Sequence, residues 1–323
     1  MPYAIRIHQT GGPEQMRWEQ VEVGKPGPGE VLVRNTAVGL NYIDTYQRTG
    51  LYPLPLPLTL GNEGAGVVEA LGPKVKEFKK DDRVAYAGPV GSYGEFVIRP
   101  AARLVKIPSG IDDKTAAAVM LKGMTAQYLL RRTYKVKKGD TILVHAAAGG
   151  VGQIMCQWAK YLGATVIGTV GSDEKVAVAK KAGSKHVIVL TKEKFPERVK
   201  EITKGKGVPV VYDGIGKDTF ADSLDCLSPL GLMVSYGNAS GPVTQFNPAI
   251  LAQKGSLFLT RPTLATYTAT REDLLRTARE LFDVVKKKIV KIPINQTYPL
   301  REAAQAHRDL EGRKTTGSTI LIP

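Results

Sequence analysis

The 323-residue sequence has only two cysteines, Cys156 and Cys226. Two cysteines are too few for a disulfide scaffold, and they are not grouped as the ligands of a structural zinc lobe would be. Both lie in stretches typical of apolar helix faces, "IMCQWAK" and "SLDCLSP". We therefore expect both thiols to be buried as small core residues without a function of their own.

Long apolar runs are also missing. No run reaches the ~18 residues that a membrane-spanning helix needs. The opening stretch "MPYAIRIHQTGGPEQ" has neither the basic start nor the apolar centre of an export signal. The sequence therefore predicts a cytoplasmic protein, and a hydrophobic content of 43% is enough for two ordinary domains.

Acidic residues are outnumbered, with 30 against 45 basic ones, which gives a net charge of +15. Such a field favours anionic partners, namely phosphorylated cofactors, acidic substrates or nucleic acid. The basic residues are dispersed, as in "KVKEFKKDDR" and "VVKKKIVK", where acidic and apolar residues interrupt them. Solvated faces explain these segments, and no DNA- or RNA-binding motif accompanies them.

Between residues 141 and 260, short β-branched runs alternate with helix-like stretches, which is typical of a parallel sheet with crossover helices. The first unit reads "TILVHA", a strand, then "AAGGVG", a turn of small residues, then "QIMCQWAKYL", a helix. About six strands follow this period, as in a dinucleotide-binding fold. Because free amides and the helix dipole stabilise a pyrophosphate, we expect it to contact Gly149, Gly150, Val151 and Gly152.

Two features qualify this glycine turn. Ala147 occupies the first glycine position of the usual fingerprint, so the turn must tolerate a methyl group there. A glycine-rich turn can also be purely structural, although its place between a strand and a helix favours cofactor binding. His145, on the strand before the turn, is interpreted as a packed strand residue rather than a catalytic one.

The end of the second strand predicts NADPH rather than NADH. An acidic side chain there would bind the ribose 2′-hydroxyl, but "GTVGSDEK" has no acid at Thr169 or Val170. Gly171 leaves room, and Ser172 and Lys175 offer a hydroxyl and a positive charge for the 2′-phosphate. The alternative is that Lys175 is a solvated helix residue.

Seven segments together carry a resemblance to a known family: "GLNYIDTYQRTGLYP", "GNEGAGVV", "LKGMTAQYLL", "HAAAGGVG", "GTVGSDEK", "VVYDGIG" and "GSTILIP". They resemble the zeta-crystallin-like quinone oxidoreductases of the medium-chain dehydrogenase/reductase superfamily, and most closely the bacterial NADPH:quinone oxidoreductases. The resemblance runs from end to end. It implies an α/β protein with a β-rich GroES-like catalytic domain at residues 1–122 and 263–323. It also implies a Rossmann cofactor domain with a doubly wound parallel sheet at 123–262, and a homodimer joined through the cofactor domains.

The same resemblance predicts an enzyme without metal. Catalytic zinc in the superfamily needs cysteine or imidazole ligands, whereas here Asn62 stands at the histidine position and Asn41 near that of the first cysteine. The four histidines are scattered along the chain, at His8, His145, His186 and His307. A quinone is already electrophilic, so its reduction can proceed without a Lewis acid.

By resemblance, the segment "NYIDTYQRTGLY" lines the cleft below the nicotinamide. Asn41 would orient the nicotinamide or the substrate, and Asp44 would orient the segment rather than act as a base. Tyr46 and Tyr52 could stack on a flat quinone and donate a hydrogen bond or proton. The competing interpretation is a polar loop with half-packed tyrosines, in which Asp44 caps a helix. The proline-rich "LYPLPLPLTLG" is expected to form a stiff loop that shapes substrate entry.

The family's other cofactor contacts carry over to a further set of positions. These are Thr125, Gly171, Ser172, Lys175, Gly237, Asn238 and Arg313. One position departs from the pattern, because similar bacterial enzymes carry a tyrosine near the 2′-phosphate where this chain has Leu190. Either the affinity for NADPH or the selectivity for NADPH over NADH is therefore expected to be lower than the family implies.

The sequence thus predicts NADPH-dependent reduction of quinones. One alternative is reduction of an activated carbon–carbon double bond in an enone or alkenal, since zinc-free relatives use the same cofactor geometry for it. Another is a binding protein whose basic surface engages RNA, with NADPH as a competitor rather than a hydride donor. The physiological quinone, the number of electrons per step and the proton donor stay open.

Overall fold

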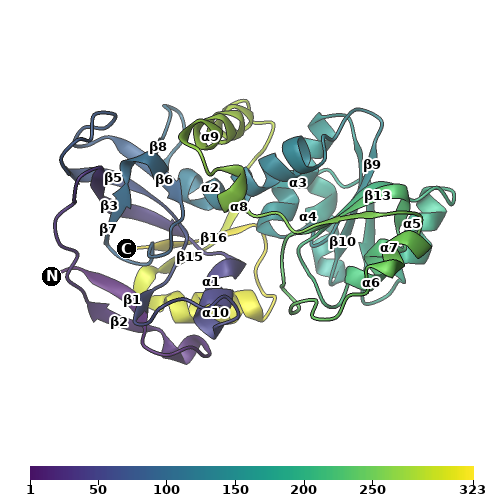
Figure 1. Cartoon of the computed structure of the whole chain (residues 1–323), viewed down its shortest axis with the longest axis horizontal. Coiled ribbons are helices and arrows are strands. Elements are labelled where there is room, and N and C mark those ends of the chain that lie inside the picture. Colours follow the sequence, from purple (N-terminus) through teal and green to yellow (C-terminus); the bar gives the residue numbers. More distant parts are fainter. The chain divides into compact units, whose positions relative to one another are not determined.

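A computed structural model describes all 323 residues. Contacts divide the chain into two compact units, which Figure 1 shows in one view. Unit 1 comprises Met1–Met124, Thr268–Phe282 and Ile292–Pro323, and unit 2 comprises Thr125–Tyr267 and Asp283–Lys291. Domain boundaries at 122 and 262 stay a prediction, and the contacts differ from it in assigning Asp283–Lys291 to unit 2.

Unit 1 is rich in β structure. Its strands are β1 (Tyr3–Ile7), β2 (Arg17–Gln20), β3 (Glu30–Gly39), β4 (Leu58–Thr59), β5 (Glu63–Leu71), β6 (Arg83–Ala87), β7 (Phe96–Pro100), β8 (Val105–Lys106), β15 (Ile294–Pro299) and β16 (Ser318–Ile322). Seven of them form one sheet, in the order β15-β16-β3-β5-β6-β8 with β7 also paired to β3. The helices α1 (Tyr42–Thr49) and α10 (Ala303–Glu311) belong to this unit.

The long strand β3 is central to unit 1, because it pairs with β5, β7 and β16. Its residues alternate between core and surface at the start, with Val31 and Val33 fully buried. Gly66 of β5 allows the close pairing, since a Cβ atom there would lie 2.1 Å from the carbonyl oxygen of Arg34. The strand ends at Gly39, directly before the segment predicted to contact substrate.

Unit 2 is a six-stranded sheet in the order β11-β10-β9-β12-β13-β14, and every neighbouring pair is parallel. The strands are β9 (Thr141–Val144), β10 (Thr165–Val170), β11 (His186–Val189), β12 (Val208–Asp213), β13 (Leu227–Ser235) and β14 (Phe258–Thr260). The strand order reverses between β9 and β12, and this switch point is where such sheets bind ligands. The prediction of six strands and a doubly wound sheet is confirmed.

Helices connect these strands. They are α3 (Gly150–Tyr161), α4 (Val176–Lys181), α5 (Phe195–Ile202), α6 (Phe220–Leu224) and α7 (Ala249–Gln253). Helix α8 (Leu264–Tyr267) follows β14, and α2 (Asp113–Tyr128) and α9 (Arg271–Lys286) each contain a change of unit. Short helical turns complete the chain, at η1 (Pro13–Gln15), η2 (Ala101–Arg103), η3 (Leu129–Thr133), η4 (Asp173–Lys175) and η5 (Leu300–Glu302).

Two expectations about the whole chain can be compared with this structure. Cys156 and Cys226 are both fully buried, as predicted, and burial raises the pKa of the Cys156 thiol to about 12. None of the helices has both the length and the apolar character needed to cross a membrane. The cytoplasmic location stays a prediction.

Candidate active site

The glycine turn of unit 2 has the geometry of a phosphate site. Gly149 is the N-cap of α3, and the N–H groups of the first helical turn have no acceptor within the helix. Gly152 lies so close to the turn that a Cβ atom there would be 2.2 Å from the carbonyl oxygen of Ala146. Helix and strand can approach this closely only because residue 152 is glycine. The turn therefore fits the pyrophosphate of a dinucleotide.

The neighbouring strand explains how the turn tolerates Ala147. The Ala147 side chain is fully buried against Gly168 of β10, where an added Cβ atom would lie 2.7 Å from the Ala147 methyl carbon. The left-handed backbone conformation falls instead on Ala146, with φ of 51°. Gly168 thus provides the space that the usual first glycine would have left.

The end of β10 carries the residues predicted to distinguish the two cofactors. Gly171 is exposed, with open space where a side chain would lie, and Ser172 and Lys175 are partly exposed beside it. Asp173 pairs with Lys192, whose Nζ atom lies 2.5 Å from its carboxylate. Sequence reasoning missed Lys192, which brings a second positive charge to this edge from the segment after β11.

His145 is a buried structural residue, as predicted. Its ring is 0% exposed, and its nitrogens contact the hydroxyl oxygens of Thr169 and Ser223, each at 2.9 Å. Burial lowers the pKa of His145, against the opposing charge of Asp213. The imidazole therefore links strand β9 to β10 and α6 as a neutral group.

In unit 1 the predicted catalytic segment forms the start of α1. Asn41 is the N-cap of α1. The carboxylate of Asp44 accepts a hydrogen bond from the backbone N–H of Asn41, with 2.9 Å between nitrogen and oxygen, as in a capping box. The Nδ2 atom of Asn62 donates to Asp44 and to the Oε1 atom of Gln47, both at 2.7 Å. Asp44 is 0% exposed. These four residues form one buried polar cluster around the first two turns of α1.

A buried ion pair completes this cluster, and sequence reasoning missed it. Lys122 of α2 lies 3.0 Å from Glu63, and their side chains are 7% and 0% exposed. Glu63 also accepts the Nδ2 atom of Asn41 at 2.8 Å and the backbone N–H of Leu121 at 2.7 Å. The Asn41 amide is therefore oriented by a carboxylate that Lys122 neutralises. The signal in the sequence was the charge of Glu63 directly before the apolar run 64–68.

Asp44 has a perturbed acidity. Burial raises the pKa of Asp44 to about 6, although hydrogen bonds from Asn62, Tyr93 and the Asn41 backbone oppose the rise. Tyr93 donates its hydroxyl to Asp44 at 2.8 Å and lies 3.1 Å from the Nε2 atom of His307. Neither Tyr93 nor His307 was among the predicted site residues.

Three tyrosines lie next to this cluster. The rings of Tyr46 and Tyr52 meet edge to face with centroids 5.3 Å apart, and Tyr42 lies 6.3 Å from Tyr46. Tyr42 donates its hydroxyl to the carbonyl oxygen of Leu310, which anchors it to α10. Tyr46 is buried and Tyr52 is partly exposed. Their stacking on a substrate stays a prediction.

The donor set around Asn62 does not fit a zinc ion. Zinc is bound by thiolate, imidazole and carboxylate groups. Here the amide of Asn62 donates from Nδ2 to Asp44 and Gln47, and its Oδ1 atom lies 3.4 Å from the Gln47 amide. No group of three or more His, Cys, Asp or Glu side chains is arranged to hold a metal.

The remaining predicted contacts are divided between the units. Arg313 is an exposed residue of unit 1 with a left-handed φ of 59°. Thr125 begins unit 2, and Gly237 and Asn238 follow β13. A Cβ atom at Gly237 would lie 2.4 Å from the carbonyl oxygen of Gly214, so only glycine fits there. Their contacts with a cofactor stay predictions.

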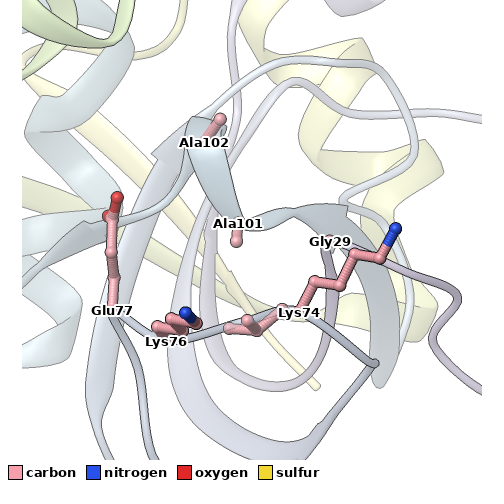
Figure 2. Close-up of a pocket in the computed structure, with 7 residues that line it drawn as sticks. Gly29, Lys74, Lys76, Glu77, Ala101 and Ala102 are labelled. Carbon is pink, nitrogen blue, oxygen red and sulfur yellow. The ribbon is translucent and has the colours of Figure 1, made fainter.

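One surface pocket of about 290 Å³ lies in unit 1, between Gly29, Lys74, Lys76, Glu77 and the start of η2. Figure 2 shows the side chains of Lys74 and Glu77 on its two sides. Gly29 directly precedes β3 and Asn41 closely follows it, so a ten-residue strand separates this pocket from the polar cluster. The pocket is therefore not part of the candidate active site.

The chain is similar to known proteins over its whole length. Residues 27–109 match the alcohol dehydrogenase GroES-like domain, and residues 150–280 match the zinc-binding dehydrogenase family. A quinone oxidoreductase of Pseudomonas aeruginosa is 55% identical to it, over 100% of both chains. The chain belongs to the quinone oxidoreductases of the medium-chain dehydrogenase/reductase superfamily. This confirms the family and the GroES-like and Rossmann folds that the resemblance implied.

Two further members of this superfamily bear on the function. The quinone oxidoreductase of Escherichia coli, solved in complex with NADPH, has a TM-score of 0.98 and 49% identity to this chain, and the match covers 99% of this chain and 100% of that one. A 2-haloacrylate reductase of Burkholderia is 49% identical, over 100% of this chain and 99% of the relative. The family therefore includes proteins named for both kinds of reduction considered above.

Proposed function

We propose that this protein reduces quinones with NADPH, by hydride transfer that needs no metal ion. The observation that carries the proposal is the amide at the metal-ligand position. Asn62 is held by Asp44 and Gln47 in a chain that is 55% identical to a quinone oxidoreductase. Quinone reduction suits such a site, because a quinone accepts a hydride readily and its reduced oxygen is a comparatively stable phenolate.

The proposed cofactor contacts lie in unit 2. NADPH, when bound, supplies the hydride, and one proton completes the hydroquinone. The N–H groups at Gly150, Val151 and Gly152 would bind the pyrophosphate at the start of α3, whereas the N–H of Gly149 already donates to the carbonyl oxygen of Ala146 at 2.9 Å. Ser172 and Lys175 would bind the 2′-phosphate. Lys192 supports this assignment, because its pairing with Asp173 offsets the negative charge that would otherwise repel the phosphate.

The proposed substrate contacts lie in unit 1. Tyr46 and Tyr52 would bind a flat quinone ring by stacking, since their own rings already meet edge to face. Asn41 would orient the nicotinamide or the substrate. The side-chain amide of Asn41 is held by Glu63, whose charge Lys122 neutralises. Because this amide is already oriented, little conformational entropy is lost when a ligand binds to it.

We also propose a homodimer formed through unit 2. Strand β14 is the last strand of the parallel sheet, so one of its edges has no partner strand. Its first residue, Phe258, is 60% exposed, and Leu230 of the neighbouring β13 is 67% exposed. An exposed edge with apolar side chains is suited to pairing with a second copy. Sedimentation velocity of the wild type and of Phe258→Lys tests the proposed dimer. We expect a dimer for the wild type and a weaker one for Phe258→Lys, and a monomeric wild type would refute the proposal.

A second candidate is reduction of an activated carbon–carbon double bond. The specific observation in its favour is the 2-haloacrylate reductase that shares 49% of its residues with this chain. Such substrates also accept a hydride at an electrophilic carbon, so the same cofactor position would serve them.

The deciding experiment is steady-state oxidation of NADPH and NADH, side by side, in chelator-treated buffer. The acceptors are 1,4-benzoquinone, 9,10-phenanthrenequinone, 2-chloroacrylate and an alkenal. We expect rapid, chelator-resistant turnover of the quinones with a preference for NADPH. Turnover of the alkenes alone would move the assignment to the second candidate. Loss of quinone activity in chelator, restored by added zinc, would refute the metal-free mechanism.

A further inference from the structure

A chain of buried hydrogen bonds connects the C-terminal helix α10 to the start of α1. The Nη1 atom of Arg48 lies 2.8 Å from the Nδ1 atom of His307. The Nε2 atom of His307 lies 3.1 Å from the hydroxyl oxygen of Tyr93, which lies 2.8 Å from Asp44. All four side chains are at most 1% exposed. Figure 1 shows α1 and α10 next to each other in unit 1.

The chemistry of its first member fixes the direction of every bond in this chain. A guanidinium group can only donate, so the Nδ1 atom of His307 must accept. Burial and the charge of Arg48 lower the pKa of His307 to about 3, so the ring is neutral and carries its one proton on Nε2. That N–H donates to the Tyr93 oxygen. The Tyr93 hydroxyl then has Asp44 as its acceptor.

The far end of the chain is held rigidly. Arg48 donates to both carboxylate oxygens of Glu311, at 3.0 and 2.7 Å, and its Nε atom donates to the carbonyl oxygen of Gly11 at 3.0 Å. A paired guanidinium with this many acceptors keeps its orientation. His307 therefore cannot adopt the other tautomer without breaking its bond to Arg48.

The near end of the chain bears on the candidate active site. Asp44 accepts from Tyr93 and from the Asn41 backbone on one oxygen, and from Asn62 on the other. If the Asp44 oxygen that accepts from Tyr93 carried a proton, this proton would point at the Tyr93 hydroxyl, which would then lose its acceptor. The hydroxyl cannot donate to His307 instead, because His307 presents an N–H to it. The chain therefore favours the ionised form of Asp44.

We propose that His307 is a positioning residue for this site: with its tautomer set by Arg48, it directs the Tyr93 hydroxyl at Asp44, and Asp44 then holds Asn41 at the start of α1. The inference rests on the proposed function, because it assigns a purpose to a contact outside the predicted site. His307 itself touches neither substrate nor cofactor. It acts on the reaction only through Tyr93 and Asp44.

Other charged groups around Asp44 are accounted for. Lys122 of α2 favours its ionised form by charge, and Lys122 is itself paired with Glu63 of β5. Arg48 of α1 is paired with Glu311 of α10. These pairs stay in place in the variants below, so a change in the titration of Asp44 reports on the chain through Tyr93.

Two variants of the same shape test the direction of the chain. In His307→Gln the amide can accept from Arg48 and donate to Tyr93, which keeps the direction of each bond. In His307→Glu the carboxylate can only accept, so it competes with Asp44 for the Tyr93 hydroxyl. Tyr93→Phe removes that hydroxyl without adding a buried charge, and it serves if the Glu variant fails to fold. His8→Gln, at an exposed histidine of unit 1, is the control for loss of a histidine.

The readout is the NMR chemical shift of the backbone amide proton of Asn41. This shift follows the titration of Asp44, because the backbone N–H of Asn41 donates a hydrogen bond to the Asp44 carboxylate. We expect a midpoint near pH 6 in the wild type, in His8→Gln and in His307→Gln. In His307→Glu and Tyr93→Phe the midpoint should rise by about one pH unit or more, because the Asp44 carboxylate loses the hydrogen bond from Tyr93. A shift in His307→Gln as large as in His307→Glu, or no shift in Tyr93→Phe, would overturn the proposal.

The pH dependence of quinone turnover separates this inference from the proposed function. If His307 positions the site, the acidic limb of the kcat profile moves with the amide midpoint from one variant to the next. A limb that stays in place while the midpoint moves would show that the chain is structural only. If wild-type protein oxidises no NADPH with any quinone, the proposed function fails, while the amide titration still tests the direction of the chain.

Discussion

The buried, neutral state of His307 predicts a specific loss of stability in acid. The pKa of His307 is lowered to about 3 in the folded protein, against an ordinary value of 6.5. Between these values the unfolded chain binds a proton that the folded protein does not. The contribution of His307 is therefore fully present above about pH 6.5 and is lost progressively as the pH falls toward 3.

The size of the effect follows from the two pKa values. Between pH 7 and pH 5, proton binding to the unfolded chain lowers the free energy of unfolding by about 2 kcal/mol. Asp44 acts in the opposite direction, because its folded pKa of about 6 lies above its ordinary 3.8, so the folded protein gains stability as the pH falls through 6. Comparison with His307→Gln cancels the Asp44 contribution, since Asp44 is present in both proteins.

The assay uses the position of the tryptophans. Trp18 lies in β2 of unit 1 and Trp158 in α3 of unit 2, so in a Trp158→Phe background fluorescence reports on unit 1 alone. We expect the wild type to lose about 2 kcal/mol more than His307→Gln between pH 7 and pH 5 in urea unfolding. This difference corresponds to about 4–8 °C in melting temperature for a unit of this size. Equal losses in the two proteins would refute the assignment of a neutral, buried His307.

Three further changes have expected outcomes. Gly152→Ala places a Cβ atom 2.2 Å from the carbonyl oxygen of Ala146, so we expect the Kd for NADPH, from a fluorescence titration, to rise about tenfold or more; an unchanged Kd would contradict the phosphate site. Lys122→Met leaves Glu63 buried without its cation and should cost about 3–5 kcal/mol in urea unfolding, whereas adding Glu63→Gln should recover part of the loss, and equal losses would show that the pair is uncoupled. Lys175→Ala should raise KM for NADPH far more than for NADH, and equal increases would remove Lys175 from the 2′-phosphate site.

The cofactor unit could be predicted well from the sequence, because its signals are local. Each strand of the parallel sheet is a short apolar run, and the glycine turn lies between adjacent elements of one strand, turn and helix unit. The tolerance of Ala147 could not be predicted in detail. It depends on Gly168 of the neighbouring strand, whose pairing with β9 is a tertiary contact.

The polar cluster of unit 1 could be predicted only in part. Asn41 and Asp44 could be predicted together because they lie three residues apart at the start of one helix. Lys122 lies 59 residues from Glu63, and Tyr93 lies 214 residues from His307. Pairings between residues so far apart in the sequence are set by how β5, α2 and α10 pack. The partner of a single charged or aromatic side chain therefore cannot be identified from the sequence alone.

The return of the chain to unit 1 has a consequence for the order of folding. Strand β3 pairs with β16, and Arg48 pairs with Glu311, which lies 263 residues later in the sequence. All six strands of the parallel sheet of unit 2 lie between these partners along the chain. Contacts between such distant residues form slowly, because a long loop must close before they are made. We therefore expect the parallel sheet to form before α1 and α10 meet.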